Sequence, residues 1–195
     1  MRRPFIAPVV ALAAATLAGC GINSIPTAEE NAKARLADLQ SQYQRRADLI
    51  PNLVATVKAA GAQEKSILVE VTQARAAANT VRVSADDLSD PAKMAQFDRA
   101  QSTLGLSLQR LQEAYPELKS QGNYTTLMSQ LEGTENRIGV ARNDYNSAVQ
   151  AYNTRIRTFP DAIGARIFYG AKPMVPFAVT TPGADQHAPS VNFGS

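Results

Sequence analysis

Two glutamates in the most polar helical stretch of the sequence stand at a spacing that could support catalysis. Glu132 and Glu135 are three residues apart, so an α-helix would present both carboxylates on one face, one turn from each other. A glycosidase built on such a pair also needs an apolar sugar cleft, and the chain contains no tryptophan. A di-iron site in a helical bundle needs Glu-x-x-His motifs, and the single histidine, His187, lies outside every predicted helix. We therefore expect no enzymatic activity, no metal and no cofactor.

Other charged and amide side chains fall where helices should face one another. Arg46 and Glu64 interrupt a seam of otherwise apolar residues, and a buried charge needs a partner. We expect an interhelical polar network that fixes the helix register, with an arginine bonded to a glutamate. A polar cleft between helices, which would serve a periplasmic ligand-binding or hydrolytic protein, is the alternative. The candidate members of the network are Arg46, Glu64, Glu132, Glu135, Asn136, Arg142 and Asn143, and Asn146 and Asn153 belong to the same polar stretch.

Two Tyr-Asn pairs, Tyr145-Asn146 and Tyr152-Asn153, repeat at an interval of seven residues. A seven-residue interval returns to nearly the same face of a helix, so both pairs should face in one direction. Tyrosine rings in a bundle are usually core residues with hydrogen-bonded hydroxyl groups. We assign these tyrosines to packing rather than to ligand contact.

Helices must position these side chains, because apolar residues recur every three or four positions between residues 27 and 159 and no period-two pattern is sustained there. Successive amphipathic helices with short links predict an all-α fold, an elongated antiparallel up-and-down bundle of three to four helices. Thr27-Ala28-Glu29-Glu30 predicts a capping box at the start of the first helix. The apolar seam that follows is too long for one straight helix, and the sequence leaves open whether it breaks at Pro51 or at Gly61.

Prolines mark the later helix boundaries. Asp90 stands before Pro91, which is typical of a capping side chain followed by the first helical residue. Pro116 should end the helix that begins there. A long helix is expected from about residue 124 to residue 158, because Pro160 follows it.

Residues 160–195 are rich in proline, a composition that resists regular structure and predicts a C-terminal tail after the bundle. Two patches in this tail, residues 163–169 and 175–179, are apolar enough to dock on the bundle. A flexible tail is the alternative, and the sequence does not distinguish the two.

The first twenty residues have the features of a bacterial export signal. Arg2 and Arg3 form a positive start, an apolar core follows, and Leu17-Ala18-Gly19 stands directly before Cys20. The apolar core is shorter than the roughly 20 residues of a transmembrane span. Leu-Ala-Gly-Cys resembles a lipobox, which implies cleavage before Cys20, diacylglycerol on its thiol and acylation of the new amine. We therefore expect a signal peptide at residues 1–19 and an acylated linker at residues 20–26, because two or three acyl chains anchor a protein stably.

Anchoring on Cys20 would place the protein in the cell envelope. Removal of residues 1–19 leaves eighteen Lys and Arg against seventeen Asp and Glu, a net charge of +1. Nucleic-acid binding needs clustered excess positive charge, so we expect no nucleic-acid partner. Gly21 follows the cysteine where aspartate would favour inner-membrane retention, which implies the outer membrane, facing the periplasm. The expected partners are the membrane and envelope proteins of unknown identity, with the bundle acting as a scaffold or interaction module.

Distinctive blocks follow one another between residues 30 and 160, and a further block lies near the C-terminus. They are Arg45-Arg46-Ala47-Asp48-Leu49-Ile50-Pro51-Asn52-Leu53-Val54, Ala74-Arg75-Ala76, Tyr115-Pro116-Glu117-Leu118-Lys119, Leu131-Glu132-Gly133-Thr134-Glu135-Asn136-Arg137-Ile138, Ala141-Arg142-Asn143-Asp144-Tyr145-Asn146 and Pro189-Ser190-Val191-Asn192-Phe193. In this order the blocks resemble the LemA family of bacterial envelope proteins. The resemblance implies a membrane-tethered helical bundle without an established molecular function, and it carries over no catalytic residues. Many members have an N-terminal hydrophobic helix where this chain has a lipobox, so the anchor differs in chemistry while the topology should be the same.

Overall fold

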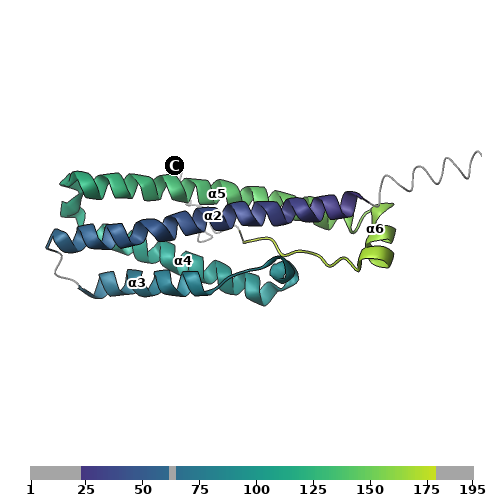
Figure 1. The fold of residues 1–195 in the computed structure, drawn as a ribbon, viewed down its shortest axis with the longest axis horizontal. Helices are drawn as coiled ribbons and strands as arrows, with labels where there is room; N and C mark the ends of the chain where they lie inside the picture. The colour runs from purple at the N-terminus through teal and green to yellow at the C-terminus, as the bar shows by residue number, and fades with distance from the viewer. Residues whose placement is uncertain (1–22, 62–64, 179–195) are drawn as a thin grey trace, which may run out of the picture.

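The computed structural model describes residues 23–61 and 65–178, and over these residues the fold is all-α (Figure 1). Four long antiparallel helices form a rod, which confirms the predicted up-and-down bundle. α2 packs mainly against α5, and α3 packs mainly against α4. The bounds of these helices are α2 Ser24–Ala59, α3 Lys65–Thr80, α4 Pro91–Ala114 and α5 Gly122–Arg155.

The two helix pairs differ in length, so part of the long pair needs other cover. α2 and α5 have 36 and 34 residues, whereas α3 and α4 have 16 and 24. Beyond the shorter pair, the apolar faces of α2 and α5 are covered by the α3–α4 connection, which includes the 3₁₀ helix η1 (Ala85–Ser89), and by residues 170–178. Figure 1 shows the latter segment running along the rod from α6 (Asp161–Gly164) toward its middle.

Pro51 does not break α2, which continues to Ala59 and ends in a turn where Gly61 has a left-handed φ of 83°. A proline has no amide hydrogen for the carbonyl four residues earlier, which is that of Ala47. The Ala47 carbonyl instead accepts a 2.7 Å hydrogen bond from Nε of Arg75 on α3. Ala47 is buried, so an unpaired carbonyl there would be costly. A side chain from the neighbouring helix therefore replaces the bond that the proline removes.

This replacement predicts that the effects of Arg75 and Pro51 substitutions are coupled. Arg75→Met is expected to lower the free energy of unfolding by about 1 to 3 kcal/mol, because it leaves the Ala47 carbonyl unpaired. In a Pro51→Ala background the restored amide can donate to that carbonyl, so the same change should cost less than about 1 kcal/mol. Urea unfolding of the four proteins measures the coupling. Arg82→Met, which removes an exposed arginine, is the control, and equal costs of Arg75→Met in both backgrounds would refute the explanation.

The first helix begins earlier than predicted. α2 starts at Ser24, and the Thr27 hydroxyl donates a 2.8 Å bond to the Asn23 carbonyl, four residues back. The predicted capping box at Thr27 is therefore wrong, because a threonine inside a helix can bond to its own backbone in this way. Pro26 is tolerated so close to the start, where amide groups need no intrahelical acceptor. The link between the bundle and the preceding segment is thus shorter than predicted.

Two of the three helix boundaries predicted from prolines are confirmed, and the third is displaced, because α5 ends at Arg155 rather than at residue 158. Asp90 caps α4, and its Oδ1 accepts from the amides of Ala92 at 2.9 Å and Lys93 at 3.3 Å. α4 ends at Ala114, and Pro116 opens the short 3₁₀ helix η2 (Pro116–Ser120). These turns reverse the chain between the antiparallel helices.

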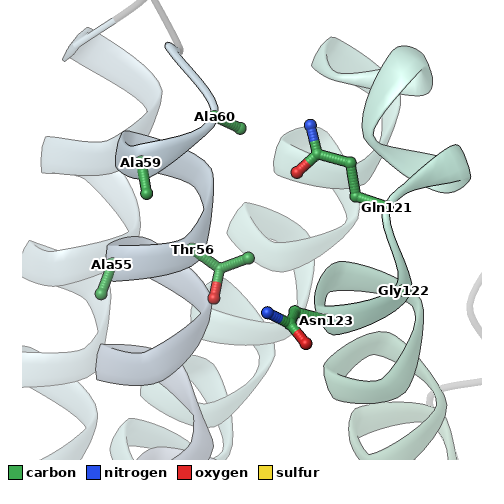
Figure 2. Close-up of a pocket in the computed structure, with 7 residues that line it drawn as sticks. All are labelled: Ala55, Thr56, Ala59, Ala60, Gln121, Gly122 and Asn123. Atoms are coloured by element: carbon green, nitrogen blue, oxygen red, sulfur yellow. The ribbon is translucent and has the colours of Figure 1, made fainter.

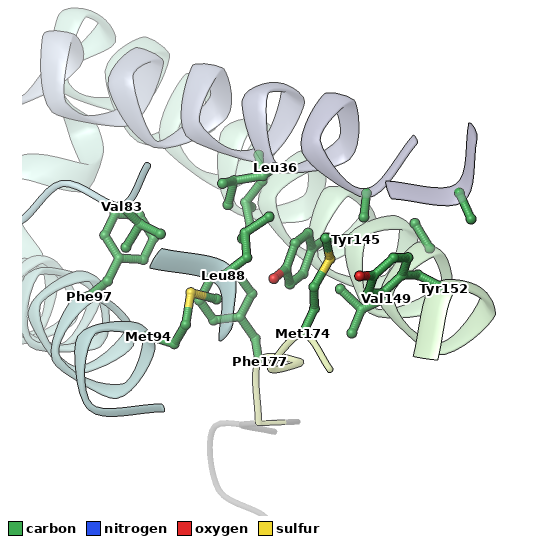
Figure 3. Packing of buried hydrophobic residues seen from close by; sticks show 14 of the residues in the cluster. Leu36, Val83, Leu88, Met94, Phe97, Tyr145, Val149, Tyr152, Met174 and Phe177 are labelled. Atoms are coloured by element: carbon green, nitrogen blue, oxygen red, sulfur yellow. The ribbon is translucent and has the colours of Figure 1, made fainter. Parts of the chain in front are cut away.

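Part of the C-terminal segment docks on the bundle. After α5 the chain forms α6 (Asp161–Gly164) and a π-helical turn, η3 (Ala165–Tyr169), and then runs extended. Met174 and Phe177 of the extended part are buried and point toward the core beside Tyr145 (Figure 3). Large side chains of residues 163–169, the other apolar patch, remain exposed. The predicted signal peptide, Cys20, Glu64 and residues 179–195 lie outside the described residues.

Candidate functional site

Arg46, in the middle of α2, is the centre of a buried polar network. Its side chain is 3% exposed, and Nη1 donates to Oε1 of Glu135 on α5 at 2.7 Å. Nη2 donates to the backbone carbonyl of Gln101 on α4 at 3.0 Å and to its side-chain Oε1 at 2.7 Å. The guanidinium carbon lies 5.2 Å from the centroid of the Tyr43 ring. A planar cation with several donors suits this arrangement, in which one side chain joins three helices.

Gln101 extends the network to the fourth helix. It is buried, and its Nε2 donates to the carbonyl of Ala78 near the end of α3 at 3.3 Å. Gly105 lies one turn further along α4 and faces the same arginine, since a β-carbon added to Gly105 would lie 3.7 Å from Nη1 of Arg46. The four helices are therefore connected at one level of the rod by Arg46 and Gln101, while Nε of Arg46 is buried there without a hydrogen-bond partner among the described residues.

Arg142 on α5 forms a second centre beside the first. Its Nη1 donates to Oδ1 of Asp98 on α4 at 2.7 Å and to the Tyr43 hydroxyl oxygen at 3.3 Å. Its Nη2 donates to the carbonyl of Ala178 at 2.7 Å, and the guanidinium carbon lies 5.2 Å from the Phe177 ring centroid. Burial raises the pKa of Tyr43, although the positive charge of Arg142 opposes the rise, so this hydroxyl stays neutral at physiological pH.

The structure brings together some of the predicted network residues. Arg46 pairs with Glu135, and Arg142 joins them through Tyr43. The prediction is wrong for three others, which are exposed because α5 turns a different face toward α2 and α4. They are Glu132, Asn136 and Asn143. The two glutamates therefore do not share a site, since one carboxylate is bonded to an arginine and the other faces solvent.

Three members of these centres, Tyr43, Gln101 and Asp98, are absent from the predicted set. The sequence could have identified Gln101, because it is a polar residue on the apolar seam between Phe97 and Leu104. The sequence could not have identified Asp98. An acidic residue beside an apolar seam usually faces solvent, and its arginine partner is 44 residues away.

Asn146 and Asn153 hold the extended C-terminal segment against α5, and we call this pair the asparagine clamp. Asn153 donates from Nδ2 to the Met174 carbonyl at 2.8 Å and accepts the Met174 amide at 2.9 Å. Asn146 repeats the pattern with Phe177 at 3.0 and 2.9 Å. Seven helical residues and three extended residues both span about 10 Å, so the two spacings match. The match explains why these asparagines recur at an interval of seven residues.

The tyrosines beside the clamp pack in the core, as their spacing predicted. Tyr145 and Tyr152 are buried, and the Tyr145 ring lies 5.1 Å from the Phe177 ring, centroid to centroid. The Tyr145 hydroxyl donates to the carbonyl of Val175 at 3.0 Å. Burial raises the pKa of Tyr145, which keeps the hydroxyl protonated as this donor.

An open hollow of about 640 Å³ lies where the end of α2 meets the start of α5 (Figure 2). Small and amide side chains line it, and the Thr56 hydroxyl donates to the Asn52 carbonyl of its own helix at 2.9 Å. The lining contains neither an arginine nor a carboxylate, so this hollow is not the predicted polar cleft. The lining residues are Ala55, Thr56, Ala59, Ala60, Gln121, Gly122 and Asn123.

The described residues hold neither a metal-binding cluster nor a membrane-spanning helix. Residues 23–61 and 65–178 contain no group of three or more His, Cys, Asp or Glu side chains placed to hold a metal ion. Among the helices in these same ranges, none combines the length and the apolar character that crossing a bilayer requires.

The model of the LemA family matches residues 35–193, which include most of α2, all of α3, α4 and α5, and the docked segment. No curated protein matches the sequence.

Proposed function

We propose that this chain, which belongs to the LemA family, is a lipid-anchored envelope protein whose helical bundle acts as a scaffold for other envelope proteins. The observation that carries the proposal is Leu17-Ala18-Gly19-Cys20 at the end of an export signal. Acyl chains on Cys20 would tether the rod, and Gly21 favours the outer membrane, facing the periplasm. α2 begins at Ser24, so the rod would start close to the bilayer surface.

Contacts inside the bundle support a scaffold rather than a ligand-binding or hydrolytic cleft. The arginines of the two polar centres bond to side chains and carbonyl groups within the bundle, which gives them a structural role. The hollow between α2 and α5 offers a ligand no charged group. Three helices of the bundle each expose a single large apolar side chain, at Val69, Leu106 and Val140, where contact with a partner can be tested.

The lipid anchor is tested by Cys20→Ser, which is expected to abolish acylation because the chain has a single cysteine. Cells supplied with labelled palmitate should label the unaltered protein, which should remain in the membrane fraction after a high-salt wash. Cys20→Ser should lose both properties, and Gly21→Ala, which keeps the cysteine, should lose neither. Retention of Cys20→Ser in washed membranes would contradict lipid anchoring.

The same cells test the scaffold role. A photocrosslinking amino acid at Val140, 62% exposed on α5, is expected to form discrete adducts with envelope proteins. Placed at Gln150, an exposed polar position on the same helix, it should form few. Absence of adducts from Val69, Leu106 and Val140 alike would argue against a scaffold.

A further inference from the structure

Exposed large apolar side chains of the described residues concentrate at one end of the rod. Five of the eight lie in or just before α6 and η3, with exposed fractions between 42% and 82%. The remaining three are scattered singly over α3, α4 and α5. We call the five residues the end patch: Phe159, Ile163, Ile167, Phe168 and Tyr169.

Local structure turns the end patch outward. Within α6 and η3 the buried residues are Gly164 and Ala165, which are small, while the bulky side chains face solvent. Gly170, in a left-handed conformation with φ 53°, ends the turn, and the Ala171 amide donates to the Ala165 carbonyl at 3.0 Å. A segment that buries its small residues and exposes its large apolar ones is unusual at a water-facing surface and marks a contact site.

Positive charge surrounds the end patch. Residues 155–172 contain four cationic residues and one acidic residue, Asp161. The Asp161 carboxylate accepts from Ser24 at 2.7 Å and lies 3.7 Å from Nη1 of Arg155, so it is already engaged. Glu29 and Glu30 on α2 both pair with Lys33. An apolar patch with a cationic rim matches the interface of an anionic phospholipid bilayer. Because Arg155 is paired with Asp161, the rim is formed by the other three exposed cationic residues, Arg157, Arg166 and Lys172.

The end patch is also close to the predicted lipid. The bond between Ser24 and Asp161 joins the start of α2 to α6, and Figure 1 shows both at the same end of the rod. Cys20 precedes Ser24 by four residues, which span at most about 14 Å when fully extended. Acyl chains on Cys20 would therefore hold α6 near the bilayer surface. The tether raises the effective concentration of lipid at the end patch, so that even a weak contact with the bilayer would form.

We propose that the end patch and its cationic rim dock on an anionic phospholipid bilayer, as a second membrane contact beside acylated Cys20. The inference rests on the proposed lipid anchor. The opposite end of the rod, with the Gly61 turn, then points away from the membrane by up to the length of α2, about 54 Å at 1.5 Å per residue. The scaffold surface would be held at a defined distance from the lipid.

A tryptophan reporter tests the contact, because the chain has no tryptophan of its own. The Phe168→Trp protein, purified from membranes in detergent, is reconstituted into vesicles of phosphatidylethanolamine and phosphatidylglycerol with or without brominated acyl chains. Bromine is expected to reduce its fluorescence at least about twofold, as for an indole inserted at the acyl boundary. Val140→Trp, on an exposed position of similar accessibility, should show no quenching.

Unquenched fluorescence of Phe168→Trp, equal to that of Val140→Trp, would overturn the docking proposal. Mass spectrometry of the same preparation reports the state of Cys20 separately. An acylated protein without quenching refutes the docking and leaves the anchor intact. Quenching with an unmodified Cys20 supports the docking and refutes the anchor.

Discussion

Arg46→Met is expected to lower the free energy of unfolding by about 2 to 3 kcal/mol. Breaking a buried ion pair typically costs about 3 to 5 kcal/mol, because a charge is left unpaired. Here the remaining carboxylate of Glu135 is 45% exposed and can be solvated, which reduces the cost. The greater loss falls on Gln101, whose buried Oε1 loses its 2.7 Å donor. Methionine retains most of the volume of the arginine stem, so the cavity contribution should be small.

Urea unfolding followed by circular dichroism measures this cost. Arg45→Met removes the neighbouring arginine, which is exposed, and should change stability by less than about 0.5 kcal/mol. Gln101→Leu in the Arg46→Met background should recover about 1 kcal/mol, because it removes the unpaired Oε1 and gives up only the long, 3.3 Å bond from Nε2 to the Ala78 carbonyl. Equal unfolding midpoints for Arg46→Met and Arg45→Met would show that the network adds no stability.

Asn146→Ala combined with Asn153→Ala is expected to release residues 170–178 and to lower the free energy of unfolding by about 2 to 4 kcal/mol. The double change removes four hydrogen bonds to the backbone of Met174 and Phe177. It also weakens the burial of these two side chains, which pack against the core. Chymotryptic cleavage after Phe177, identified by mass, should accelerate at least about tenfold, because cleavage requires local opening.

The same helix supplies a matched control for this change. Asn136→Ala combined with Asn143→Ala removes two exposed asparagines of α5, also seven residues apart. Cleavage after Phe177 and the unfolding midpoint should both stay close to those of the unaltered protein. If the two double variants are cleaved at the same rate, the asparagine clamp does not hold the segment.

The clamp also bears on the proposed membrane contact. Residues 170–178 follow η3 directly and are bonded to α5 and, through the Val175 amide, to the Leu88 carbonyl at 2.8 Å. The chain on the other side of the end patch continues from α5. Both flanks of α6 and η3 are therefore fixed to the rod, which limits how far the end patch can move from the start of α2.

The sequence by itself determined the helical rod and several of its ends. A repeat of three to four residues identifies an amphipathic helix without reference to any other segment, and Asp90-Pro91 and Pro116 act through their own backbone geometry. The expectation of a polar network also came from local pattern, since Arg46 stands on an apolar seam. These features depend on residues within a few positions of one another.

Tertiary structure alone decided the rest, because the partners are far apart in the chain. Pro51 stays inside α2 since Arg75 bonds to the carbonyl that the proline leaves free. The rotation of α5 in the bundle brings Glu135 within reach of Arg46 and leaves Glu132 bonded to no arginine and facing solvent, although both belong to one polar stretch. Docking of the C-terminal segment depends on asparagines 21 and 31 residues earlier, whose spacing fits an extended segment only once that segment lies beside the helix. Periodicity specifies which faces are apolar, and packing specifies which polar groups meet.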